Sequence, residues 1–593
     1  MLLPERLTPT SIICVKRDVE VILETLSDFG EFHIKETRED SATNLSEYKA
    51  NIQKLRDAIN DIDDLTKQFA DKKNDLFGLF KNVSPTKSVV VTNDWHTLTE
   101  STIQKISSVK NETVEVKNLL NDLNKEKEQL EHIKDELSSF EAIKEIDDKL
   151  KVNSEKEKEL TDKLRKIGEE NKKQFVAWKE TSENILLLLN TKMKVLESGP
   201  YATIEGFTPQ KKFNTLCDIL NKKIDGKVIV SKTDPPKQDH KNHAKTMPPT
   251  KMSNNKFVKP FEELTKLYGL PKYNEIDPTP IMAITFPILF GLMFGDLGHG
   301  LLLLIGGLTV GKLLKNNQGM KNLCYIMAAC GVAACITGVL FGEFFGQAIF
   351  TPLWFSPFHG AGVSTFLIYC LYVGVAQIMI GLALEMGNFI VNHKIADAVL
   401  TSIPKMAFFM GGVYILYTYW LDFGAWLNGP ILLAIIPFII LAVGKPIYLA
   451  IAKPANPSGE HEEMDKISNR LFDGGDFFIR LLGNTISYAR ILALLMAHWA
   501  LMLAVGAIAG LIGTASILHI ILSTVIIIFG NIFVLALEGL IVFIHTLRLH
   551  FYEWFSKFYI GSGTAFTPFK LKHTYTEVIF EKEKTHKEKQ DTI

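Results

Sequence analysis

The chain has 593 residues, a formal net charge of −1 and 47% hydrophobic residues, totals that resemble those of an ordinary soluble protein. They average two unlike halves, because the first is rich in Lys and Glu whereas residues 281–555 are mostly Leu, Ile, Gly, Phe and Ala. The near-zero charge therefore says nothing about partners. Charges of both signs interleave in the first half, which argues against nucleic-acid binding.

The first and last parts of the hydrophilic half share a strand–helix–strand pattern. Residues 11–34 show it first, with a helix expected to end at Gly30. Residues 201–230 repeat it, with a turn expected at 206–209 before a helix at 211–223. These two units predict one small α+β lobe, built from both ends of a long insertion.

The insertion is predicted to form a long antiparallel coiled-coil hairpin. Its apolar residues recur at helical spacings in two segments: Ile52, Leu55, Ile59, Ile62, Leu65 and Phe69 in one, and Val116, Leu123, Leu130, Ile133, Leu137 and Phe140 in the other. Residues 231–260 follow as an expected flexible linker, because two Pro-Pro pairs and many polar residues cannot bury a core. Its His240 and His243 are more simply surface histidines than metal ligands.

The second half contains apolar runs long enough to cross a membrane. They occupy residues 281–311, 322–350, 363–391, 406–421, 430–451, 477–511 and 516–548. Three connections carry cations: Lys312, Lys315 and Lys321 in one, Lys394 and Lys405 in another, and Lys445, Lys453, Lys466 and Arg470 in the third. The positive-inside rule places these connections in the cytoplasm.

The first run is expected to turn back within the membrane. No apolar signal-peptide core precedes the hydrophilic half, which is therefore expected in the cytoplasm, so residues 281–311 must cross an even number of times. The polar, glycine-rich break at 295–300 divides the run and predicts an eight-helix membrane domain with both termini cytoplasmic. The alternative is one long helix with the hydrophilic half outside. The last two runs, each ~52 Å long as helices, must tilt or protrude from a core of ~30 Å.

Two arginines within the last two apolar runs are the strongest functional signal. Arg490 and Arg548 stay charged at membrane depth, at a cost of about 2.5–3.5 kcal/mol each on insertion scales. No acid of the chain is an obvious close partner for Arg490, which predicts a partner on another polypeptide. Arg548 comes late in its run and could instead extend to the cytoplasmic interface.

Other polar residues are ordered by depth around these arginines. Asp476 is expected near the cytoplasmic mouth, and His498 follows Arg490 by ~12 Å of helical rise toward the outside. On the last run, Asn531, Glu538 and His545 recur every seven residues and share one face.

Asp296 and His299, at the outer turn of the first hairpin, complete an outward cluster. This order of acid, arginine, acid and histidine predicts two offset half-channels for a proton. For Glu538 a structural role between helices remains open, as it does for Glu343 and Glu385 near span ends.

The sequence offers no site for ATP hydrolysis, so we expect a non-catalytic chain without a cofactor. Residues 306–312 match most of a phosphate-binding loop, but Leu313 replaces the Ser or Thr that would hold magnesium. The six cysteines are scattered singly, which indicates buried apolar roles in a reducing compartment rather than a metal site. Any energy from ATP must therefore come from a partner.

Several motifs in the second half resemble those of one family, the membrane stator subunit (subunit a or subunit I) of rotary V-type and archaeal A-type ATPases. The matching stretches are residues 260–264, 268–271, 275–280, 290–300, 487–490, 537–540, 547–550 and 567–569. This resemblance implies that Arg490 and Arg548 face a rotating proteolipid ring and release protons from its glutamates. It also implies that Asp476 lines the cytoplasmic half-channel and that Glu538 and His498 line the outer one. Further candidates within or beside these motifs are Asn484, His545, His550, Asn531 and Asp296.

The resemblance also implies an organisation and a set of partners. We expect a cytoplasmic lobe and hairpin over residues 1–230, a linker over 231–260, a membrane domain over 261–570 and a cytoplasmic tail over 571–593. The implied partners are the proteolipid ring, peripheral-stalk subunits, the lipid membrane and, indirectly, the central stalk and ATPase head, in what resembles a prokaryotic plasma-membrane complex.

One departure from the family concerns residues 138–160, where a second α+β lobe usually docks the stalk and only charged helical sequence is found here. Two other functions stay open, a self-contained secondary transporter and a membrane scaffold. Proton versus sodium specificity, synthesis versus hydrolysis and ring stoichiometry also stay open.

Overall fold

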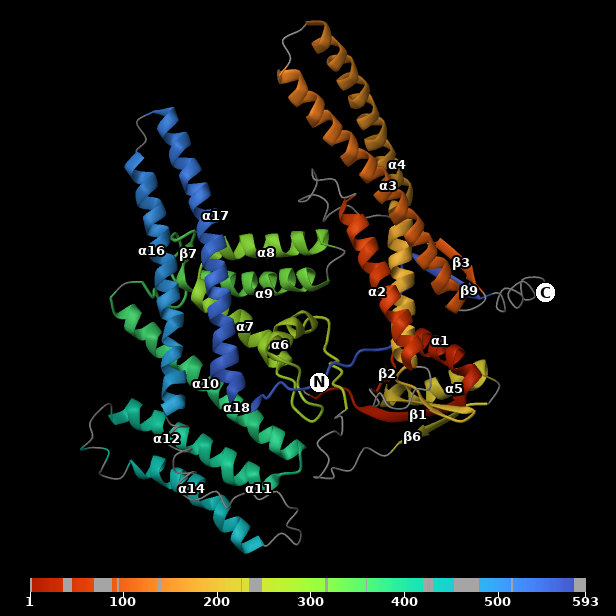
Figure 1. Ribbon diagram of the computed structural model, residues 1–593. Helices are drawn as coiled ribbons and strands as arrows, with labels where there is room; N and C mark the ends of the chain where they lie inside the picture. The colour runs from red at the N-terminus through yellow and green to blue at the C-terminus, as the bar shows by residue number, and fades with distance from the viewer. Residues whose placement is uncertain are drawn as a thin grey trace, which may run out of the picture. The chain divides into compact units, whose positions relative to one another are not determined.

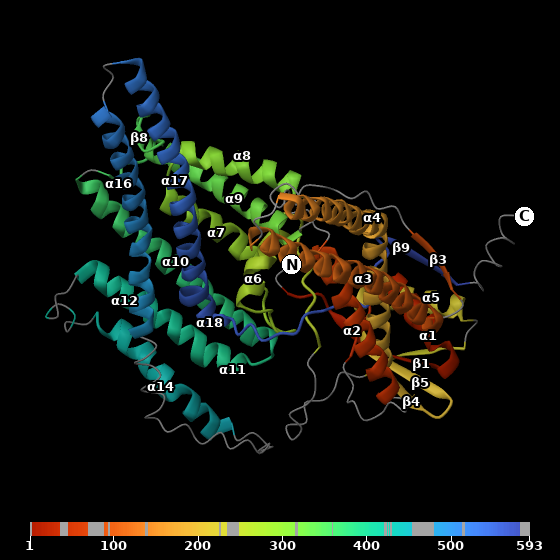
Figure 2. The same ribbon diagram turned by 45° about the horizontal axis from the view of Figure 1, so that its top comes forward.

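The computed structural model describes residues 3–35, 45–68, 88–92, 95–136, 140–224, 227–233, 248–314, 318–358, 360–419, 424, 426, 430–452, 479–512 and 516–580. The chain divides into two compact units, one of Leu7–Pro235 with Thr567–Ile593 and one of Met1–Arg6 with Pro236–Phe566 (Figures 1 and 2). Asp476, His240 and His243 lie outside the described residues. The described secondary structure is mainly helical.

An antiparallel sheet organises the first unit. Its strands run in the order β2 (His33–Ile34), β5 (Tyr201–Pro209), β1 (Leu7–Val15) and β6 (Ile229–Lys232), and β4 (Leu196–Ser198) also pairs with β5. Helices α1 (Val19–Phe29) and α5 (Phe213–Lys223) contribute to the same buried core as the sheet. The segments before and after the long insertion therefore form one α+β lobe around this sheet.

The expected turn at 206–209 is wrong, because β5 continues through these residues. Thr208 pairs with Thr8 and Pro209 with Leu7, while Phe207 faces both β1 and β2. Gly206 serves a close approach here: a Cβ at this position would lie 2.4 Å from the Phe32 ring and from the His33 carbonyl oxygen. Only glycine lets the strand lie this close to Phe32.

Three helices fill the insertion between the strands. Helix α3 (Trp95–Glu136) runs antiparallel to α4 (Phe140–Lys192), as ion pairs Lys127–Glu157 and Lys134–Asp147 show. Helix α2 (Leu45–Gln68) packs against both helices of this hairpin. Its Ile62 and Leu65 lie in a core shared with α3 and α4. Among the described residues, the apolar segment that begins at Ile52 thus packs with α3 and α4 near residues 106–116 and 167–175, and this core includes no residue of 123–136.

The C-terminal segment joins the first unit. Strand β9 (Thr576–Phe580) pairs in parallel with β3 (Ser88–Thr92). Glu180 of α4 accepts hydrogen bonds from the backbone N–H groups of Tyr575 (3.0 Å) and Thr576 (3.1 Å) and from the Thr576 hydroxyl (2.9 Å). One buried carboxylate therefore fixes the start of β9 on α4.

The second unit is a bundle of apolar helices. They are α7 (Thr279–Phe294), α8 (Leu297–Leu313), α9 (Gln318–Phe341), α10 (Ala361–Val391), α12 (Ile403–Tyr419), α14 (Leu432–Ala452), α16 (Ala489–Ile512) and α17 (Ile517–Arg548). Within the residues that the structure describes, five helical stretches are long and apolar enough to cross a membrane: 318–341, 361–391, 395–419, 479–512 and 517–557. Three shorter apolar helices, α7, α8 and the first part of α14, accompany them.

The apolar run at 281–311 is broken into α7 and α8, as its polar centre predicts. Gly295 ends α7 in the left-handed conformation, with φ of 46°. Asp296 then caps α8, because its carboxylate accepts a hydrogen bond from the backbone N–H of His299 at 2.9 Å. The break therefore places Asp296 and His299 together inside the bundle.

Helices α16 and α17 lie side by side and cross the direction of α8 and α9 steeply (Figures 1 and 2). Beyond Arg548 the helix widens into a π-helical segment, η7 (Leu549–Phe555), before the short α18 (Ser556–Phe558). Only 6% of the most apolar part of α17 is buried within the chain, against 39% for α9. Most of the α17 surface must therefore be covered by lipid or by another protein.

Candidate functional site

Two clusters of polar residues lie within the apolar helices. We call Asp296, His299, His498 and Glu538 the acid–histidine cluster, and Arg490, Arg548, Glu553 and Asn484 the arginine cluster. Helix α16 carries both His498 and Arg490, and α17 carries both Glu538 and Arg548. Along α16 the two clusters are separated by ~12 Å of helical rise, and along α17 by ~15 Å.

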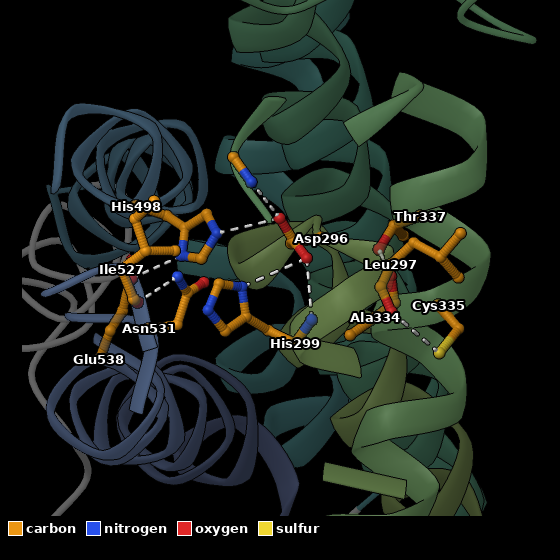
Figure 3. Close-up of polar contacts among 11 residues, drawn as sticks. Asp296, Leu297, His299, Ala334, Cys335, Thr337, His498, Ile527, Asn531 and Glu538 are labelled. Carbon is orange, nitrogen blue, oxygen red and sulfur yellow. Dashed lines mark hydrogen bonds and ion pairs between the residues drawn. The ribbon is translucent and has the colours of Figure 1, made fainter. Parts of the chain in front are cut away.

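The acid–histidine cluster is buried and closely bonded (Figure 3). His498 Nδ1 lies 2.6 Å from Glu538 Oε2, which joins α16 to α17. Asp296 accepts two backbone hydrogen bonds, from His299 N at 2.9 Å and from Gly346 N at 2.7 Å. The sequence-predicted grouping of Asp296, His299, His498 and Glu538 is therefore a contact between three helices.

Several polar atoms of this cluster face one another without forming hydrogen bonds. His498 Nε2 lies 3.7 Å from Asp296 Oδ2, and His299 Nδ1 lies 3.2 Å from Asp296 Oδ1. Neither ring nitrogen of His299 has a hydrogen-bond partner among the described residues, and neither does His498 Nε2 or Glu538 Oε1. Because unpaired buried polar atoms are costly, the cluster is suited to holding a further proton, water or cation.

Aromatic rings enclose the cluster. Phe294 lies 5.0 Å from the His498 ring and Phe345 lies 5.0 Å from the His299 ring, both measured between ring centroids. The two imidazole rings are edge to face, 5.2 Å apart. Apolar walls of this kind strengthen electrostatic interactions inside the cluster, because they lower the local dielectric constant.

Asn531 and His545 extend the polar face of α17 on both sides of Glu538. Asn531 Nδ2 donates to the Ile527 carbonyl at 2.7 Å, and its side chain lies beside the acid–histidine cluster (Figure 3). Asn531 Oδ1 and His545 Nδ1 are buried without a hydrogen-bond partner among the described residues. Asn531, Glu538 and His545 therefore form a polar stripe along the helix. Each has a buried polar atom without a hydrogen-bond partner among the described residues.

Glu553 is a functional candidate that sequence reasoning missed. Its Oε1 lies 3.9 Å from Arg490 Nη1, and both side chains are largely buried. The expectation that no acid of the chain approaches Arg490 is therefore wrong. The contact is nevertheless long, and Arg490 Nη1 has no hydrogen-bond partner among the described residues. A guanidinium offers five N–H donors, so this single long contact leaves it far from saturated.

Arg548 differs from Arg490 in its exposure. It lies on the exposed face of α17 and has no carboxylate within ion-pairing distance in the described part of the chain. With Glu553 it lines a cleft of about 420 Å³, whose other lining residues are Gly483, Asn484, Ser487 and Tyr552. The Asn484 amide can donate to the Arg480 carbonyl at 3.0 Å and accept from Lys557 Nζ at 2.8 Å. The cleft is thus polar, open and adjacent to both arginines.

His550 makes contacts of a different kind. Its Nδ1 donates to the Thr546 carbonyl at 2.8 Å, so Nε2 accepts from the Thr285 hydroxyl at 2.9 Å. The ring is fully buried and is not among the residues that line the cleft. The bond to Thr285 attaches η7 to α7, the bond to Thr546 holds the ring against its own helix, and together they position the neighbouring Arg548.

The other intramembrane acids have separate environments. Glu385 Oε1 lies 2.7 Å from Lys405 Nζ, and Ser402 donates to the other oxygen at 3.4 Å. Glu385 therefore bridges helices, one of the two roles that its position in the sequence leaves open. Glu343, in β7 (Glu343–Phe344), is buried and its Oε2 has no hydrogen-bond partner among the described residues.

A bundle of apolar helices with arginines and carboxylates at membrane depth defines a class of membrane proteins that move ions. Within that class, the chain belongs to the V-type ATPase 116kDa subunit family, whose model matches residues 138–360 and 431–571. This match confirms the family that the sequence motifs indicate.

Curated relatives are similar along most of the chain. The "A-type ATP synthase subunit I" of Methanocaldococcus jannaschii is 29% identical over 76% of this chain and 69% of the relative. Those of Aeropyrum pernix and Pyrococcus abyssi are 29% and 30% identical, over 66% and 72% of this chain. The matches cover 60% and 63% of these two relatives, so each is longer than the part it shares with this chain.

Proposed function

We propose that this chain is the membrane stator subunit of a rotary ATPase of the A/V type, in which it guides protons or sodium ions to a rotating proteolipid ring. Its relatives are named as subunits of A-type ATP synthases, and its apolar helices fit an integral membrane subunit. The observation that carries the proposal is the separation of the acid–histidine cluster from the arginine cluster along α16 and α17.

The acid–histidine cluster forms the outer half-channel in this proposal. Glu538 and His498 share a hydrogen bond, and Asp296 faces His498 across 3.7 Å, so a proton can be held at any of three adjacent groups. Asn531 and His545 continue the polar face of α17 on either side. Protons that reach Glu538 still have to pass the arginines to cross the membrane.

The arginine cluster separates this path from the cytoplasmic half-channel. Two permanent positive charges at Arg490 and Arg548 oppose the passage of a free proton through low-dielectric surroundings. A mobile carboxylate that approaches them is forced to ionise, because the charged form is stabilised beside a guanidinium. The cleft lined by Asn484, Ser487 and Glu553, together with Asp476, then receives the released proton on the cytoplasmic side.

The carboxylate has to come from another polypeptide. Arg548 is exposed on a helix that the described part of the chain hardly covers, and among the same residues Arg490 has only the long contact with Glu553. A charge of this kind facing lipid alone is unfavourable by about 2.5–3.5 kcal/mol or more. A ring of proteolipid subunits with acidic side chains provides both an apolar surface for α17 and the missing partner for its arginines.

The first unit acts as the cytoplasmic arm of the stator. The α3–α4 hairpin has charged, solvent-exposed faces joined by ion pairs, and residues 140–160 are part of the continuous helix α4. We assign its far end to the peripheral stalk, which prevents the stator from turning with the ring. The central stalk and ATPase head are contacted only through these partners, and both termini lie in the cytoplasm.

The proposal is tested by removing the charge at position 490 in assembled complexes. We expect Arg490→Ala to abolish ATP-driven pumping into reconstituted vesicles while the proteolipid and ATPase head still co-purify with the chain. Arg490→Lys keeps the charge but loses the planar fork, so it should retain a small part of the activity. Full pumping by Arg490→Ala would contradict the proposal.

A self-contained secondary transporter is separated by a second measurement. Such a protein moves ions when the chain alone is placed in vesicles under an ion gradient, whereas a stator without its ring does not. Gradient-driven flux through the isolated chain, lost in Arg490→Ala, would favour the transporter.

A further inference from the structure

The acid–histidine cluster contains more ligand groups than its hydrogen bonds use. One ligand atom each from Asp296, His299 and His498 can be chosen so that all three lie within 4.8 Å of one another, and all three residues are buried. Both ring nitrogens of His299 and Nε2 of His498 lack hydrogen-bond partners among the described residues. Figure 3 shows the Asp296 carboxylate facing both imidazole rings, which come from α8 and α16.

We propose that Asp296, His299 and His498 form a binding site for one divalent transition-metal ion of the Zn²⁺ class. Two imidazole nitrogens and one carboxylate oxygen are a donor set that Zn²⁺ and Co²⁺ accept, whereas Mg²⁺ and Ca²⁺ prefer oxygen ligands alone. Three protein ligands leave the fourth tetrahedral position for water. The sequence did not predict this metal site. His498 is about two hundred residues from the other two ligands, so no local spacing marks the three as a set.

The distances are compatible with this ion. Ligand atoms bound to the same tetrahedral Zn²⁺ at ~2.0–2.1 Å lie ~3.3–3.5 Å apart. Asp296 Oδ2 and His498 Nε2 are 3.7 Å apart, and Asp296 Oδ1 and His299 Nδ1 are 3.2 Å apart. A shift of a few tenths of an ångström brings the first pair into range. The two distances involve different oxygens of Asp296, so the carboxylate must rotate to present one oxygen to both rings. His299 must also turn its ring, because the three chosen ligand atoms span up to 4.8 Å.

The groups around the ligands also match a metal site. Glu538 accepts from Nδ1 of His498, which leaves the Nε2 lone pair directed at Asp296. A carboxylate behind a histidine ligand is a recurrent feature of zinc sites, because it fixes the tautomer and increases the basicity of the ring. Backbone N–H groups of His299 and Gly346 hold the Asp296 carboxylate in the same way.

Occupancy has a consequence for transport that rests on the proposed function. If the cluster is the outer half-channel, a bound Zn²⁺ occupies the nitrogens and oxygens that would otherwise carry protons between Asp296 and His498. Zn²⁺ on the outer side of the membrane, opposite the ATPase head, should then inhibit ATP-driven pumping of the wild-type complex. Other cations that bind only through oxygen, such as Mg²⁺, should not inhibit at the same concentration.

Metal binding is tested directly with Co²⁺ on the purified, chelator-treated chain. We expect one Co²⁺ per chain, with the intense visible absorption of a tetrahedral site, and its displacement by one Zn²⁺. His299→Gln and His498→Gln should each lose this spectrum, whereas His519→Gln, an exposed histidine of α17, should retain it. Equal uptake by all three variants would show an adventitious ion only and would overturn the proposal.

Two further outcomes keep the metal site and the half-channel distinguishable. If His299→Gln and His498→Gln do not fold, the wild-type spectrum still decides, because only weak, octahedral-type absorption would overturn the site. If Co²⁺ and Zn²⁺ bind with the expected stoichiometry but pumping is not inhibited, the metal site stands and its location on the proton path is contradicted.

Discussion

The acid–histidine cluster and the arginine cluster both include residues of α16 and α17, yet their charged groups differ in the partners that the chain provides for them. Asp296, His498 and Glu538 are buried, and each finds a hydrogen-bond partner or a charged neighbour within the chain. Arg548 is exposed, and Glu553, at 3.9 Å, is the one acid that Arg490 reaches within the described ranges. The first cluster is therefore part of the folded core, whereas the second is unfinished in the isolated chain.

This difference has an energetic meaning. Buried charges are stabilised by their partners, so removing one member of the acid–histidine cluster leaves an uncompensated charge. Removal of an exposed arginine changes the stability of its own chain little, because solvent or detergent already surrounds the side chain. Mutations in the two clusters should therefore separate effects on folding from effects on transport.

The largest effect on stability is expected from His498→Ala. It removes the cation-forming partner of both Glu538 and Asp296, and breaking a buried pair of this kind costs about 3–5 kcal/mol. We expect a clearly lower melting temperature of the purified chain and reduced yield. Arg548→Ala should change stability by less than about 1 kcal/mol while transport by the complex is lost. Equal destabilisation by both substitutions would remove the distinction between the clusters.

Sequence patterns predicted the acid–histidine cluster better than the arginine cluster. Its members could be found because the glycine-rich break at Gly295 marks a turn, and because Asn531, Glu538 and His545 repeat every seven residues. The strand–helix–strand units were visible for the same reason, since their periodicity is local. The pairing partners of the apolar segment at 52–69 were not, because several charged helices could satisfy it equally well.

Glu553 shows why the arginine cluster was harder to predict. It follows Arg548 by five positions, an offset that places two side chains on different faces of an α-helix. In the π-helical segment η7 five residues make about one turn, and both residues line the same cleft. The residue pattern does not predict a π-helix. In the described part of the chain no further acid approaches the arginines, so a partner beyond Glu553 can be proposed only from the cost of leaving two buried or membrane-facing cations unpaired.

A second prediction concerns the support of Asp296. Gly346 donates to Asp296 Oδ2 from a backbone with φ of 67°, and a Cβ there would lie 2.2 Å from Met502 Cβ. Gly346→Ala should therefore destabilise the chain by about 1–3 kcal/mol and weaken proton pumping, because it displaces an Asp296 donor.

Gly506→Ala is the matched control, since it stands one turn after Met502 on α16 and a Cβ there meets nothing within 4 Å. It should leave the melting temperature of the isolated chain unchanged or slightly raised, by up to about 1 kcal/mol of helix propensity. A lower melting temperature for the control than for Gly346→Ala would show that α16, and not the Asp296 support, is the sensitive element.

The smallest effect is expected from Glu553→Gln, which tests how far Arg490 depends on its own chain. The amide keeps the size of the side chain but removes the charge that faces Arg490 at 3.9 Å. A pair this long contributes up to about 1 kcal/mol, so the melting temperature should barely change and turnover should fall by at most about fivefold. The slower turnover follows because Arg490, freed from Glu553, holds the approaching carboxylate of the ring more tightly. Complete loss of pumping, matching that of Arg490→Ala, would mean that Glu553 is the main partner of Arg490 and that this cluster, too, is completed within the chain.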